Sequence, residues 1–117
     1  MAQTGDNSKK ALVEALNGAL ADHLALYVKT KNFHWHVKGP RFHDLHLLFD
    51  SQSQQILSVV DAIAERVRKN DADTLTSIGS IGKTSQIADE DDTTLDADKM
   101  VEQLRDDNAK LVTRLKE

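Results

Sequence analysis

The sequence predicts an all-α protein folded as one antiparallel bundle of long helices. Apolar residues recur at helical spacing over long stretches, while the alternation typical of strands is missing from the chain. The chain has one proline and five glycines, so few positions break a helix. With 117 residues it has room for a single domain, 1–117. Within this range, we expect residues 1–8 to form a flexible tail.

The first helix is expected from Ser8 to about Val37. Asp6, Asn7 and Ser8 are all suitable N-cap residues. Gly39-Pro40 ends the helix, because proline cannot continue the hydrogen-bond ladder. An apolar stripe at four-residue spacing defines its buried face, formed by Leu12, Leu16, Leu20 and Leu24.

A second helix is expected from roughly Arg41 to Asn70, with Pro40 suited to its first turn. Its apolar positions again follow a helical period, from Phe42 to Val67. Two long helices joined by a tight break are typical of a helical bundle.

The segment 70–98 differs, because it is rich in Gly, Ser, Thr and Asp. We expect one short helix in it, Thr74 to Ile81. The run Gly79–Thr84 resembles a phosphate-binding loop only superficially, since Ser77 stands at the first glycine position and no strand precedes it. A last helix is expected from Asp96 or Ala97, and its apolar pattern is still running where the sequence stops.

Composition excludes several classes of protein. The net charge of −4 is not the balance of a nucleic-acid-binding protein. Without cysteine the chain has neither disulfides nor thiolate metal sites, which fits a reducing compartment. The polar amino terminus lacks the apolar core of a signal peptide, and no stretch is long enough to span a bilayer. We therefore expect a soluble cytoplasmic protein, and we interpret charged runs such as 89–92 as solvated surface.

Histidines and carboxylates carry the chemical signal. Four of the five histidines fall between residues 34 and 46. His46 and Asp50 are four residues apart, as are Asp61 and Glu65, so each pair lies on one helical face. Within such a pair, both side chains can reach one metal ion.

The two pairs cannot meet within one copy of the helix. From His46 to Glu65 a helix rises about 28 Å at 1.5 Å per residue, which is too long for one metal centre. A two-fold axis between Gln55 and Ile56 solves this, because two antiparallel copies then place the first pair of one chain against the second pair of the other. His34, just before the Gly39-Pro40 turn, can add a nitrogen ligand. Two such sites arise in each dimer.

Two imidazoles and three carboxylates suit iron or manganese and tolerate zinc. Other interpretations stay open for the parts of this set. Asp61 and Glu65 also fit a plain charged face, and His46 with Asp50 also fits a hydrogen-bonded pair. Trp35 is either a packing anchor at the helix end or an oxidisable ring beside the metal. The remaining histidines are expected at the surface or behind the ligands for His36 and His43, and half-buried for His23.

The stretch Lys31 to Asp50, with Phe33-His34-Trp35-His36 near its start, resembles the Dps family, the DNA-protection-during-starvation or mini-ferritin proteins. The spacing of the five candidate ligands matches the motif of that family: His34, His46, Asp50, Asp61 and Glu65. The sequence also lacks any Glu-x-x-His, with which larger ferritins build a site inside one subunit.

The resemblance implies a ferritin-like bundle assembled into a hollow cage of twelve subunits. It implies metal sites at two-fold interfaces, each with room for two iron ions, ligated by the five residues above with Trp35 as a neighbour. It further implies oxidation of Fe(II), preferably by hydrogen peroxide, otherwise by O2, and storage of Fe(III), which protects DNA.

The chain departs from the family in two ways. We expect a third long helix that is cut short and no fourth, which would leave an apolar face exposed. The tail offers only Lys9 and Lys10 for DNA, so binding there, and nucleoid association, have weak support. Two alternatives therefore stand beside the ferroxidase: a DNA-binding protein with a vestigial metal site, and an inactive fragment.

Overall fold

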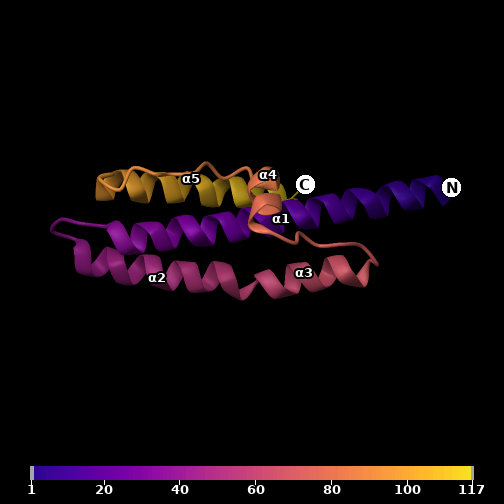
Figure 1. Ribbon diagram of the computed structural model, residues 1–117, viewed down its shortest axis with the longest axis horizontal. Helices are drawn as coiled ribbons and strands as arrows, with labels where there is room; N and C mark the ends of the chain where they lie inside the picture. Colours follow the sequence, from indigo (N-terminus) through magenta and orange to yellow (C-terminus); the bar gives the residue numbers. More distant parts are fainter. Residues whose placement is uncertain (1, 117) are drawn as a thin grey trace.

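The computed structural model describes the backbone of residues 2–116 and the side chains of residues 7–114. Every regular element in the described part is helical, and together the helices form an elongated body of 60 × 24 × 20 Å (Figure 1). The helices are α1 (Ala2–His36), α2 (Phe42–Ser58), α3 (Val60–Lys69), α4 (Ile78–Thr84) and α5 (Ala97–Lys116). The described helices include none that is long and apolar enough to cross a membrane.

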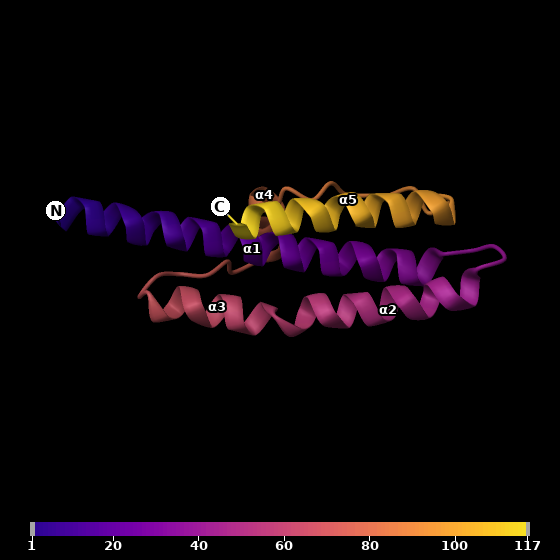
Figure 2. The same cartoon turned by 180° about the vertical axis from the view of Figure 1, so that it is seen from behind.

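Helix α1 is the centre of the bundle and touches each of the other four helices. A tight turn at Gly39, whose φ of 101° favours glycine, sends α2 and α3 back antiparallel to α1. The crossover segment 70–96 then returns along the molecule, so that α5 also runs antiparallel to α1, on its other side (Figures 1 and 2). The predicted all-α antiparallel bundle is confirmed.

Helix α1 begins at Ala2, six residues before the predicted start at Ser8. Its polar first turns project beyond the bundle (Figure 1). The polar residues and the single Gly5 lower helix propensity, but unlike proline they do not break the hydrogen-bond ladder. The expected tail is thus helical from Ala2 onward, and its flexibility stays a prediction.

The single second helix that we predicted is in fact two, α2 and α3, interrupted at Val59. The Ser58 hydroxyl donates a 2.6 Å hydrogen bond to the Gln55 carbonyl, which competes with the helical ladder. Two β-branched residues, Val59 and Val60, follow directly and are stiff in a helix. The two helices nevertheless continue in nearly the same direction (Figure 1).

The short helix α4 begins at Ile78, four residues after its predicted start at Thr74. Ser77 is extended and caps the helix, because its hydroxyl accepts from the Ser80 amide at 3.1 Å. The Ser80 hydroxyl accepts from the Ser77 amide in return, which completes a capping box. The predicted start of α5 near Ala97 is confirmed.

The core lies along α1, where its apolar stripe meets α2 on one side and α5 on the other. Phe33 and Phe49 are almost fully buried, with ring centroids 6.4 Å apart. Met100 and Leu104 add the contribution of α5. Burial of such side chains contributes about 1.5–3 kcal/mol each relative to exposure.

Two buried ion pairs hold α5 against α1. Lys29 Nζ lies 2.7 Å from Asp107 Oδ2, with both side chains about 95% buried. Arg114 Nη1 lies 3.1 Å from Asp22 Oδ2. On α1 the acid Asp22 comes seven residues before the base Lys29, and on α5 the acid Asp107 likewise comes seven residues before the base Arg114. Each acid therefore meets a base in only one antiparallel register. Buried charges cost stability when unpaired, so these pairs disfavour any shifted register.

Gly18 makes room for the second of these pairs. A Cβ atom at this position would lie 2.7 Å from Arg114 Nη1 and 2.9 Å from Cζ. The guanidinium therefore reaches Asp22 only because residue 18 has no side chain.

An open groove separates α2 from α5. Two adjoining cavities of about 310 and 340 Å³ share Gln52 and Asn108 along it. Leu48 and Val101 line the groove and remain 45% and 38% exposed. The apolar face that we expected three long helices to leave open is therefore present.

We predict that Lys29→Met destabilises the fold by about 3 kcal/mol, because it leaves the Asp107 carboxylate buried without a counter-ion. The double change Lys29→Met/Asp107→Leu should cost less than the single one, since no charge is then stranded. Urea unfolding followed by circular dichroism measures both. Lys99→Met, which removes a pair exposed to solvent, is the control and should change stability by less than about 1 kcal/mol. A Lys29→Met effect as small as the control would contradict the role of the buried pair.

Candidate metal centre

His34 on α1 and His46 on α2 form the centre of the site. Because α1 and α2 are antiparallel neighbours, the two rings stack with centroids 3.8 Å apart and an interplanar angle of 18°. Phe42, one turn before His46, extends the stack at a centroid distance of 5.1 Å. The rings are thereby fixed in position before any ligand arrives.

The hydrogen bonds of these rings set their tautomers. His34 Nδ1 lies 2.6 Å from the His46 carbonyl oxygen, and His46 Nδ1 lies 2.7 Å from the His34 carbonyl oxygen. A carbonyl oxygen can only accept, so each Nδ1 carries the proton. In the neutral rings each Nε2 therefore keeps a free lone pair, the form in which histidine binds metals.

Asp50 lies one turn after His46 and is held by a lysine. Lys31 Nζ donates to Asp50 Oδ1 at 2.6 Å, and Gln54 donates to Oδ2 at 3.1 Å. The hydrogen bond from Lys31 holds the pKa of Asp50 below its ordinary value, and nearby His34 and His46 act in the same direction. The same bond raises the pKa of Lys31. Asp50 is thus ionised, but both of its oxygens already accept a hydrogen bond, so a cation would have to displace one of the two donors.

Asp61 and Glu65 lie on α3, beyond the break at Val59, and both are exposed to solvent. The structure stacks His34 on His46 and places Asp50 close enough for a charge interaction with both, but it leaves Asp61 and Glu65 on a separate helix. Among the described residues of one chain, no group of three or more His, Asp or Glu side chains is placed to hold an ion. One chain therefore carries two separate halves of the predicted ligand set.

The other histidines lie outside this stack. His36 Nδ1 donates to the Asn32 carbonyl at 2.9 Å, and His43 is exposed at the surface. His23 is 5% exposed, so the expectation of half-burial was wrong. Its Nδ1 donates to the Ala19 carbonyl, which satisfies it inside the bundle. Trp35 is 64% exposed, so within the described residues it does not act as the packing anchor that the sequence allowed.

Sequence reasoning missed Lys31 and Phe42 as parts of this site. Lys31 stands three residues before His34, so it lies on the same face of α1, and that spacing was the available signal. Phe42 stands four residues before His46 and gave the same signal. In the sequence analysis Lys31 had no assigned role, and Phe42 counted only as the first apolar position of the second helix.

Comparison with known proteins places the chain in a family. A family model for the ferritin-like domain matches residues 13–117. The crystal structure of a Dps protein from Bacillus brevis has a TM-score of 0.87 and 30% sequence identity, over 92% of this chain and 72% of that one. This chain belongs to the Dps family of ferritin-like proteins.

Two further proteins are similar to this chain in sequence or in structure. The DNA protection during starvation protein of Agrobacterium fabrum is 35% identical over 81 residues, 69% of this chain and 50% of that protein. The antigen TpF1 of Treponema pallidum has a TM-score of 0.89 at 29% identity, over 92% of this chain and 69% of that one. The chain spans half of the Agrobacterium relative and 40% of a second DNA protection during starvation protein, from Bacillus anthracis.

We predict that Lys31→Met raises the pKa of Asp50 toward the ordinary aspartate value, because the donor that stabilises the carboxylate is lost. In the parent chain the Lys31–Asp50 contact stabilises the fold above the pKa of an unfolded aspartate, and this contribution is lost as the pH falls through the lower pKa of the folded state. Carboxyl-carbon NMR titration of both metal-free proteins measures the shift. An unchanged Asp50 pKa in the variant would contradict the contact.

Proposed function

We propose that this Dps-family chain is a ferroxidase that binds Fe(II) at a site shared between two copies, oxidises it and stores it as Fe(III). The observation that carries the proposal is the stack of His34 and His46, with both Nε2 lone pairs free beside the ionised Asp50. Asp61 and Glu65 would complete the ligand set from a second copy. Membership of the ferritin-like family supports iron as the substrate.

The donor set fits iron chemically. Imidazole nitrogens and carboxylate oxygens suit a divalent ion of intermediate character, and without thiolates the set does not favour Cu(I). Five protein ligands shared between two iron ions leave coordination positions for an oxidant. Two Fe(II) ions each lose one electron, and one hydrogen peroxide takes both electrons and two protons to become two waters. With O2 as the oxidant, the same site would supply the electrons more slowly.

Lys31 has a defined part in this proposal. Without metal it neutralises Asp50 and fixes the carboxylate beside the two histidines. An arriving cation must displace the ammonium group from Oδ1 or bind through Oδ2, which Gln54 holds more loosely at 3.1 Å. Lys31 therefore fixes the Asp50 carboxylate in position but lowers its affinity for a metal ion.

DNA binding is the second candidate function. Lys9 and Lys10 are exposed near the amino end of α1. Two cations give only weak, strongly salt-dependent binding, although several copies in one assembly would add avidity. DNA retardation that disappears in Lys9→Gln/Lys10→Gln, with iron oxidation absent, would favour this function over the ferroxidase.

We predict that Asp61→Ala/Glu65→Ala abolishes rapid iron oxidation and lowers the rate by at least about tenfold. Without these two carboxylates, the ligands of the partner copy (His34, His46 and Asp50) cannot form a complete site. Fe(II) is added without oxygen, then hydrogen peroxide, and ferric absorbance is followed in time. The matched control is Glu102→Ala/Asp106→Ala, two exposed carboxylates at the same spacing on α5.

The parent chain and the α5 control should oxidise iron at the same rate. If the parent chain is no faster than free iron in buffer, this chain is not a ferroxidase. If the α3 variant matches the parent, the metal is bound elsewhere.

A further inference from the structure

A pocket of about 300 Å³ lies between α1 and the crossover segment 70–96, and its lining includes Trp35, the residue that follows His34. Its apolar wall carries Trp35 and Val28, which are 64% and 59% exposed. Only Ile78 is more exposed among the large apolar side chains of the described residues. These two side chains are seven residues apart on α1, so they share one face of the helix. Covering this face would bury two large apolar side chains.

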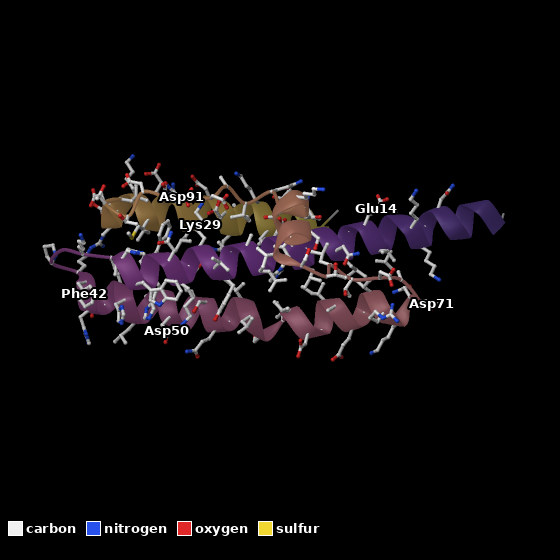
Figure 3. The ribbon with its side chains drawn as sticks, viewed as in Figure 1. Glu14, Lys29, Phe42, Asp50, Asp71 and Asp91 are labelled. Atoms are coloured by element: carbon white, nitrogen blue, oxygen red, sulfur yellow. The ribbon has the colours of Figure 1, made fainter. Side chains whose placement is uncertain are left out.

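The rim of this pocket is acidic. Asp89 and Asp91 line it and are exposed to solvent. Lys29 also lines it, but Asp107 already neutralises that lysine in a buried ion pair (Figure 3 marks Lys29 and Asp91). Glu90 is engaged by Gln103 and by the Asp92 amide, which together lower the pKa of Glu90. The pocket thus offers an exposed indole beside uncompensated negative charge, a combination that suits a cation.

The last turn of α3 is basic and exposed. Arg66, Arg68 and Lys69 follow Glu65, the last candidate metal ligand, and we call these three residues the basic end of α3. Arg68 is partly used within its own chain, since it donates to the Ala72 carbonyl and contacts Asp73. Arg66 and Lys69 remain available for contacts with another molecule.

The register of the shared metal site brings these two features together. Contacts of His34 with His46 and of Lys31 with Asp50 set the alignment of α1 along α2. Because the helices are antiparallel and His34 is opposite His46, the next residue of α1, Trp35, is at the same height along the bundle as Leu45 of α2. In the two-fold pairing that joins the ligand pairs, Leu45 is opposite residue 66 of the second copy.

We propose that the pocket beside Trp35 receives the basic end of α3 from a second copy of this chain. The inference rests on the proposed function, because it assumes the two-fold pairing that completes the metal site. Trp35 offers its ring face to a guanidinium or ammonium group, and Asp89 and Asp91 neutralise the charge. The contact lies next to Glu65, so it fixes the carboxylates of one copy against the histidines of the other.

Trp35 is the only tryptophan, so its fluorescence reports on this pocket alone. The purified full chain is examined over a range of concentrations by sedimentation velocity and by tryptophan emission. We expect emission to shift to shorter wavelength, and acrylamide quenching to fall, over the same range in which dimers form. Arg66→Gln/Lys69→Gln should weaken dimerisation about tenfold, with the loss growing at low salt. The control Lys99→Gln/Lys110→Gln removes two cations from α5 and should change it less than about twofold.

Charge reversal separates the contact from a fault in folding. Asp89→Lys/Asp91→Lys should prevent pairing, and mixing that chain with Arg66→Glu/Lys69→Glu should restore it. Dimers whose Trp35 emission is unchanged, and which tolerate the loss of both cations, would overturn this contact while leaving the shared metal site intact. A chain that stays monomeric at all concentrations, with or without Fe(II), would overturn both.

Discussion

The position of α1 between two antiparallel partners is the constraint on which the rest of the structure depends. The buried pairs Lys29–Asp107 and Asp22–Arg114 fix α5 on one side in a single register. The Gly39 turn fixes α2 on the other side. Because α1 cannot slide against either neighbour, His34 meets His46 and Lys31 meets Asp50 without any metal to gather them.

The same rigidity makes the predicted ligand set impossible to complete within one chain. The helices α2 and α3 run in nearly one line, so Asp61 and Glu65 stay remote from His46 and Asp50. A short loop in place of α3 could have folded back, but ten residues of helix cannot. The proposed chemistry therefore needs a second copy, and the pocket beside Trp35 gives the basic end of α3 of that copy a place to bind.

Much of the fold could be predicted from the sequence, because helical spacing and the Gly39-Pro40 break are local signals. The break at Val59 was missed, since it depends on which way the Ser58 hydroxyl turns. The partners of Lys29 and Asp22 were missed because they depend on how the crossover aligns α5 with α1. The spacing of the candidate ligands could be recognised in the sequence. The contact of Lys31 with Asp50 could not, because it depends on how α1 and α2 are rotated about their axes relative to each other.

The most direct test of a site shared between copies is complementation of two inactive chains. One chain carries His46→Ala/Asp50→Ala and the other Asp61→Ala/Glu65→Ala, and peroxide-driven iron oxidation is measured for each alone and for the refolded mixture. Random pairing should restore about a quarter of the parent sites, because each mixed dimer contains one intact site. A mixture as inactive as its two components, although mixed dimers are detected, would contradict the shared site.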